Sequence, residues 1–157
     1  MLFRSYHPEV WTSQETDNID LLIVSLKYGA LPTALDTIKQ ATRQNTIVMS
    51  LMNGVDSEEI IGAKIGMSHI LPALIKVASH KEPDGYHFDR KSTIGIIFGE
   101  YKPPFQSERV KAVCDLFEKG DISYRATDYI REEIWSKFRL NVCNNLRSEE
   151  RRVGKEC

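Results

Sequence analysis

Short apolar runs that alternate with helix-like segments constrain the fold of this chain more than any other feature of its sequence. One continuous apolar run covers residues 19–26, and a second covers residues 46–51. Runs this short and this rich in β-branched residues are typical of strands buried on both faces. Between them, residues 30–43 place apolar side chains at helical spacing, with Pro32 tolerated in the first turn. The order strand, helix, strand predicts parallel strands joined by right-handed crossovers.

A further helix is expected directly after the second run. Asp56 has the position of its N-cap, and Glu59, three residues later, completes a capping box. Gly66 is expected to lie at the end of this helix. The remaining expected elements are a strand near 68–78, a pair of strands near 86–90 and 92–98, an amphipathic helix over 106–119, a short strand at 121–126 and a last helix that begins at Asp128.

The net charge and the positions of cysteine and histidine argue against several classes of function. The formal net charge is -1, which gives no reason to expect bulk binding to nucleic acid or to an anionic membrane. No apolar run approaches the roughly 20 residues that cross a bilayer, and residues 1–20 lack the apolar centre of a signal peptide, so we expect a cytoplasmic protein. Neither a disulfide framework nor a metal site is expected, because no ligand spacing links Cys114, Cys143, Cys157, His7, His69, His80 and His87.

Polar residues follow the two predicted strands at the points where these strands end. Lys27 follows the first strand, and Asn53 and Gly54 follow the second. In open α/β sheets, ligands bind outside the carboxyl ends of the parallel strands. Lys27 offers a charge for a phosphate or a substrate oxygen, Asn53 offers a donor and an acceptor, and Gly54 lets a ligand approach the backbone. Each of them alone is also consistent with a solvated loop residue.

A polar stripe is predicted on the last helix. Lys137, Asn141 and Asn145 are spaced i, i+4 and i+8, so they drift by only about 80° around the helix and share one side. An adjacent apolar stripe is formed by Ile130, Ile134 and Phe138. This arrangement suits the wall of a cleft, although an ordinary solvated helix face has the same spacing.

Three segments together resemble one known family. They are residues 20–27, 52–55 and 133–145, with the sequences DLLIVSLK, MNGV and EIWSKFRLNVCNN. In their order and separation they resemble ketopantoate reductase (2-dehydropantoate 2-reductase), and the resemblance covers about residues 19–146. It implies NADPH-dependent reduction of the 2-keto acid 2-ketopantoate to pantoate on the route to pantothenate. It also implies NADP as the cofactor and a homodimer for the intact protein.

The same resemblance implies roles for individual residues. Lys137 would be the general acid that protonates the ketone oxygen, and Asn141 and Asn145 would bind the substrate. Asn53 would contact both cofactor and substrate, and Lys27 would contact the cofactor. Hydride addition builds negative charge on the carbonyl oxygen, so a nearby ammonium group stabilises that charge and can supply the proton. Partial burial of Lys137 would bring its pKa toward the working pH.

The chain also departs from the family pattern. The family begins with a strand and a GxGxxG turn that binds pyrophosphate, and this sequence contains no such turn. We therefore expect an inactive fragment with an α/β fold, in which a partial Rossmann-type parallel sheet with flanking helices is followed by the first helix of an all-α C-terminal domain. The expected parts are a truncated dinucleotide-binding domain at 1–126, the start of a helical substrate domain at 127–146, and a foreign tail at 147–157 that resembles a translated sequencing adapter. Two alternatives remain open: a related 2-keto acid reductase and a non-catalytic nucleotide-binding module.

Overall fold

Two parallel strands form the first half of the central layer. The computed structural model describes residues 18–77, 79–83, 85–89 and 93–153, and for 80–82, 86 and 144–153 it describes the backbone alone. β1 (Leu21–Val24) pairs in parallel with β2 (Ile47–Ser50), with Leu21 opposite Ile47 and Val24 opposite Ser50. Both strands lie inside the apolar runs of the sequence, and their parallel pairing is confirmed.

Three further strands extend this layer. β6 (Gly95–Phe98) lies between β3 (Ala73–Lys76), to which it is antiparallel, and β7 (Tyr124–Ala126), to which it is parallel. An isolated parallel bridge between Val48 and Ile70 connects these strands to β2. The α/β class with parallel strands and flanking helices is therefore confirmed, while β3 adds an antiparallel neighbour to it.

The predicted pairing of residues 86–90 with 92–98 is wrong. β5 (Gly85–Phe88) pairs with β4 (Ser79–Glu82) in a hairpin, and β6 pairs with β3 instead. The physical reason is burial, because every residue of β6 is buried and such a strand is stable with partners on both sides. Proximity along the sequence indicated β5 as the partner of β6, whereas the structure pairs β6 with β3.

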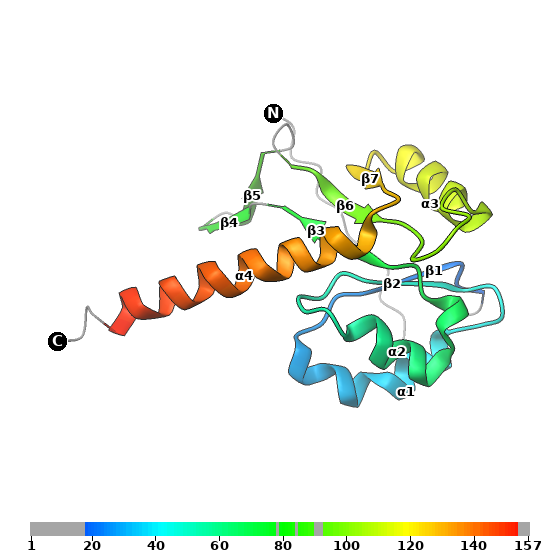
Figure 1. Ribbon diagram of the computed structural model, residues 1–157, viewed down its shortest axis with the longest axis horizontal. Helices are drawn as coiled ribbons and strands as arrows, with labels where there is room; N and C mark the ends of the chain where they lie inside the picture. The colour runs from blue at the N-terminus through cyan, green and yellow to red at the C-terminus, as the bar shows by residue number, and fades with distance from the viewer. Residues whose placement is uncertain (1–17, 78, 84, 90–92, 154–157) are drawn as a thin grey trace.

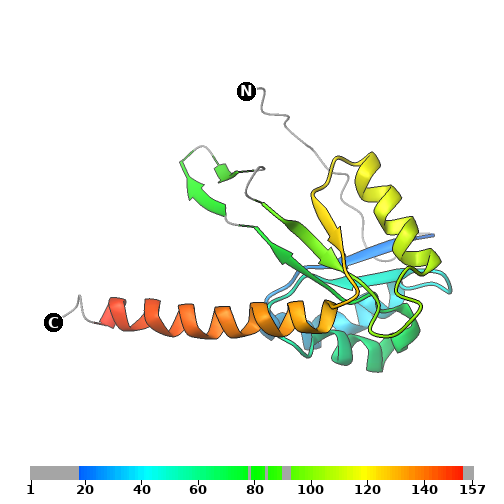
Figure 2. The ribbon, with the colours of Figure 1, turned by 45° about the horizontal axis from the view of Figure 1, so that its top comes forward.

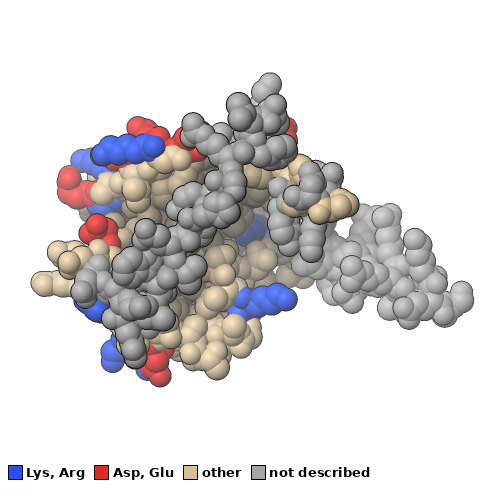
Figure 3. Space-filling view, turned by 180° about the vertical axis from the view of Figure 1, so that it is seen from behind, with Lys and Arg blue, Asp and Glu red and all other residues tan. Residues whose placement is uncertain are grey.

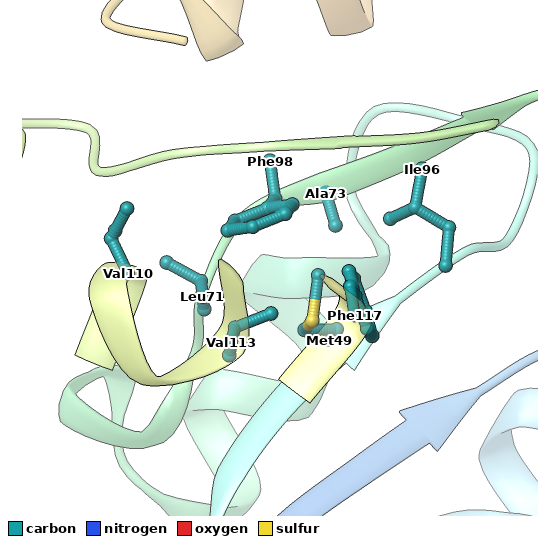
Figure 4. Packing of buried hydrophobic residues seen from close by; sticks show 8 residues of the cluster. All are labelled: Met49, Leu71, Ala73, Ile96, Phe98, Val110, Val113 and Phe117. Carbon is teal, nitrogen blue, oxygen red and sulfur yellow. The ribbon is translucent and has the colours of Figure 1, made fainter. Parts of the chain in front are cut away.

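Helices cover both faces of the strand layer (Figures 1 and 2). α3 (Glu108–Lys119) packs on one face, where Val110, Val113 and Phe117 meet residues of β2, β3 and β6 (Figure 4). The aromatic rings of Phe98 and Phe117 meet edge to face, with their centroids 5.7 Å apart. Strand side chains alternate between the faces, so this arrangement gives three layers.

The opposite face carries the other helices. α1 (Leu31–Ala41) and α2 (Ser57–Ile65) pack on Val24 and Val48, and short 3₁₀ turns precede α1 at Tyr28–Ala30 and follow α2 at Met67–His69. α4 (Ile130–Val153) packs on Leu74 of β3 and Ile97 of β6 at its amino end, and then extends away from the strands (Figure 1).

Most helix bounds agree with the sequence expectations to within two residues. α2 begins after Asp56 and ends before Gly66, but the Asp56 side chain makes no capping hydrogen bond, so the predicted capping box is wrong. The carboxylate of Asp56 instead accepts a hydrogen bond from Tyr28, in the 3₁₀ turn before α1, and does not cap the helix. The structure describes no side chain in residues 147–157, so the foreign tail stays a prediction.

The described residues show no broad region of one charge sign on the face drawn in Figure 3, where basic and acidic side chains lie interspersed along the left side. Within the described ranges, no helix combines the length and the apolar character that crossing a membrane requires.

Candidate functional site

The carboxyl ends of β1 and β2 carry the two predicted strand-end residues on one edge of the sheet. Because the strands are parallel and in register from Leu21 to Val24, the segments that follow them leave the sheet at the same edge. Lys27 lies directly before the 3₁₀ turn after β1, and Asn53 lies in the turn after β2; both are exposed. The shared edge was predicted from the strand pattern.

A hydrogen bond ties these two segments together. The Tyr28 hydroxyl donates to Asp56 Oδ2 at 2.7 Å, and this bond to a carboxylate raises the pKa of the Tyr28 phenol. No sequence pattern indicates this contact, because its two residues are 28 positions apart and nothing in their spacing links them. The contact joins the segment of Lys27 to the segment of Asn53.

Gly54 has a backbone conformation that other residues rarely adopt. Its φ is 126°, and a β-carbon placed there would meet only the Asp56 Oδ1 atom, at 3.5 Å. Glycine is therefore favoured at position 54 by the backbone angle and not by a lack of space. The side of the turn where that β-carbon would lie stays open, as expected for a position where a ligand approaches the backbone.

Close contact at its first turn fixes α4 on the strand layer. Ile130 and Ile134 are buried against Leu74 and Ile97. A β-carbon at Gly99 would lie only 2.0 Å from the carbonyl oxygen of Thr127, so glycine allows the segment before α4 to pass directly over the end of β6. The direction of α4 is thus set by packing at its amino end.

This direction brings the polar side of α4 to the turn after β2. The Asn141 Nδ2 atom donates to Asn53 Oδ1 at 3.4 Å, a long hydrogen bond between residues 88 positions apart in the sequence. The two side chains therefore lie side by side, which favours the interpretation of the polar stripe as one side of a site. The side chain of Asn145, the third residue of the stripe, lies outside the described residues.

Lys137 lies one helical turn before Asn141 and is partly buried. Burial lowers the pKa of its ammonium group, and the positive charge of Lys76 lowers it further. Both effects disfavour the charged form of the lysine. The direction of this change is the one expected for a lysine that donates a proton near neutral pH.

A group of ion pairs adjoins Lys137. Glu133 accepts from Lys76 Nζ through Oε2 at 2.6 Å and from Arg125 Nη2 through Oε1 at 2.5 Å. Lys76 and Arg125 hold the pKa of Glu133 below its usual value, against the effect of burial. Nothing in the spacing of these residues along the sequence indicates the two partners of Glu133.

A second acidic residue, Glu58, is buried in the first turn of α2, the helix that follows β2. Its side chain accepts from the Ser57 hydroxyl at 2.9 Å, and Ser57 in turn contacts the Ser50 hydroxyl at 2.8 Å. Burial raises the pKa of Glu58. Burial, with the charge of Glu58 as the next cause, raises the pKa of Tyr101 to about 12. Glu58 is therefore a buried and hydrogen-bonded carboxyl group in the first turn of α2.

The described residues at this edge are suited to an organic ligand. No group of three histidine, cysteine, aspartate or glutamate residues in the described part of the chain could hold a metal ion. Lys27 offers an exposed charge, Asn53 offers an amide donor and acceptor, and the backbone at Gly54 stays open to approach.

Comparisons with known proteins identify relatives of this chain in sequence and in fold. Residues 3–103 match the family model described as ketopantoate reductase PanE/ApbA. The uncharacterized oxidoreductase YkpB of Bacillus subtilis is 22% identical over 134 residues, which cover 85% of this chain and 44% of that protein. A 2-dehydropantoate 2-reductase of Streptococcus pyogenes is 25% identical over 139 residues, which cover 88% of this chain and 44% of that protein. The chain thus spans about 44% of the length of these curated relatives.

Solved structures show the same fold. The 2-dehydropantoate 2-reductase of Geobacter metallireducens superimposes with a TM-score of 0.70 at 25% identity, over 83% of this chain and 43% of that one. A dimeric ketopantoate reductase of Staphylococcus aureus superimposes with a TM-score of 0.63 at 17% identity, over 82% of this chain and 45% of that one.

Proposed function

Because the chain belongs to the ketopantoate reductase PanE/ApbA family of oxidoreductases, we propose that its residues form part of the active site of an NADPH-dependent 2-ketopantoate reductase. The observation that carries this proposal is the contact between Asn141 and Asn53. It supports the proposal because Asn53 follows β2 at the carboxyl edge, where ligands bind in open α/β folds, and the half-buried Lys137 lies one turn before Asn141 on α4.

The proposed chemistry divides between the cofactor and the side chains. When bound, NADPH supplies the hydride that reduces the ketone carbon. Lys137 stabilises the negative charge that develops on the ketone oxygen and transfers a proton from Nζ to that oxygen. Asn53, Asn141 and Asn145 orient the substrate through amide hydrogen bonds, and Lys27 binds the cofactor by its charge.

Finer parts of the proposal concern the whole enzyme. We propose that it serves pantothenate synthesis in the cytoplasm and assembles as a homodimer, and the dimeric Staphylococcus aureus reductase supports the last point through its similar fold. The 157-residue chain is itself expected not to oxidise NADPH, because no GxGxxG turn for the pyrophosphate lies within it.

The test is steady-state kinetics of a full-length protein that contains these residues. Lys137→Met should lower kcat for 2-ketopantoate by about two to four orders of magnitude, because the proton donor is lost while the stem of the side chain remains. Lys111→Met is a matched control, since Lys111 is exposed on α3 and pairs with Glu108 of its own helix. A near-normal kcat in Lys137→Met would remove this residue from the acid role.

A related 2-keto acid reductase is the second candidate. The described residues assigned to the substrate are amides and an ammonium, and these recognise the keto acid group that all such substrates share. The curated relative of Bacillus subtilis is an uncharacterized oxidoreductase, so the family match leaves the substrate side group open. A panel of 2-keto acids decides between the candidates: kcat/KM should be highest for 2-ketopantoate, and NADPH binding without turnover of any of them would favour a non-catalytic module.

A further inference from the structure

The carboxylate best placed to pair with Lys137 is already bound elsewhere. Glu133 precedes Lys137 by four residues, the spacing at which a glutamate and a following lysine pair most favourably on a helix. The two oxygens of Glu133 instead accept from Lys76 at 2.6 Å and from Arg125 at 2.5 Å. Among the side chains that the structure describes, no carboxylate forms an ion pair with Lys137.

The groups that hold Glu133 come from two strands that are distant in sequence. Lys76 is the last residue of β3, and Arg125 lies in the middle of β7. The side chains of Lys76 and Glu133 are 26% and 23% exposed, so solvent screens their attraction less than it screens a surface pair. Lys76 is the better buried of the two cations, because the side chain of Arg125 is 48% exposed.

We propose that Lys76 is a positioning residue for Lys137, because it holds the Glu133 carboxylate away from Lys137 and leaves that ammonium group without an anionic partner beside Asn141. This inference deepens the proposed function, since the importance of an unpaired Lys137 depends on its role as the acid. An ammonium paired with a carboxylate is a weaker acid, because the carboxylate stabilises the charged form.

The charged surroundings of Lys137 support this assignment. Glu133 comes from α4 itself, Lys76 from β3 and Arg125 from β7, whereas Asn53 and Asn141 are neutral. Lys76 also acts on Lys137 directly, since its positive charge disfavours a second ammonium nearby. Loss of Lys76 therefore has two consequences in the same direction: the repulsion ends, and Oε2 of Glu133 becomes available to Lys137 while Oε1 keeps its bond to Arg125.

The experiment follows the titration of Lys137 in the 157-residue chain by NMR, with carbon-13 in the lysine ε position. The signal is assigned by its disappearance in Lys137→Arg. In Lys76→Met, the midpoint of the Lys137 titration should rise by about one pH unit. In the double variant Lys76→Met/Glu133→Gln the rise should be clearly smaller, because only the repulsion is lost. Lys76→Arg keeps a cation for Glu133 and should restore the wild-type midpoint.

Two results would overturn the proposal. One is an unchanged Lys137 midpoint in Lys76→Met, and the other is an equal rise with and without Glu133, which would limit Lys76 to a direct charge effect. Lys111→Met controls for the loss of one positive charge at a distance, and Lys76→Gln replaces Lys76→Met if the methionine variant does not fold. These titrations do not measure turnover. They can therefore fail while the reductase assignment stands, and the reductase assignment can fail while the titrations give the expected shifts.

Discussion

The two sides of the candidate site differ in how their polar groups are held. At the β1–β2 edge, Lys27 and Asn53 are exposed, and the bond that joins their segments, between Tyr28 and Asp56, is also exposed. On α4, Lys137 is partly buried and Glu133 lies between two cations. Partly buried charges interact more strongly than exposed ones, so substitutions on the α4 side should change the molecule more.

The largest effect is expected where α4 is attached. Ile134 is 6% exposed and packs on the strand layer, so Ile134→Ala should lower the free energy of unfolding by about 2–4 kcal/mol. Urea unfolding followed by circular dichroism measures this value. Leu140→Ala on the same helix is the control, because Leu140 is 53% exposed and should cost less than about 0.5 kcal/mol. Equal losses in the two variants would show that α4 is not held at its amino end.

An intermediate effect is expected at Glu133. Its folded-state pKa lies below the ordinary 4.5, chiefly because Lys76 binds it, so its contribution to stability is present above about pH 4.5 and is lost as the pH falls through the lowered value. Glu133→Gln should reduce stability at neutral pH by about 1–2 kcal/mol and should flatten this acid-side dependence. Urea unfolding at a series of pH values gives both results. If the loss of stability at acidic pH is unchanged in Glu133→Gln, other carboxylates cause that loss.

The smallest effect is expected at the loop edge. Asp56→Asn replaces the carboxylate whose hydrogen bond and charge raise the pKa of Tyr28, so the phenol should titrate closer to its ordinary value of 10.0. Phenolate absorbance during a pH titration measures the change, with Tyr28→Phe identifying the contribution of this tyrosine. If Asp56→Asn destabilises the chain as much as Glu133→Gln does, the contrast between the two sides is wrong.

Local sequence patterns predicted the elements better than their partners. The bounds of α1 and α2 and the parallel pair β1–β2 follow from apolar spacing, and the family membership indicated by three short motifs is confirmed. The partner of β6 was missed, because two strands compete for a buried strand and sequence proximity favoured the wrong one. The domain division at residue 126 and the roles of the site residues stay predictions.

The candidate site shows the same division. Spacing alone placed Lys137 and Asn141 on one side of a helix, and the strand pattern placed Lys27 and Asn53 at one sheet edge. Neither pattern could say that Asn141 meets Asn53, because that contact depends on where Ile130 and Ile134 pack.

The sequence by itself determined where most strands and helices lie, though not β4, and which polar groups share a side of each element, because these properties depend on neighbours within a few positions. The tertiary structure alone decided that Glu133 binds Lys76 and Arg125 rather than Lys137. The physical reason is that the local helix pair is worth only about 0.2–0.5 kcal/mol, so two partly buried cations brought from β3 and β7 outweigh it.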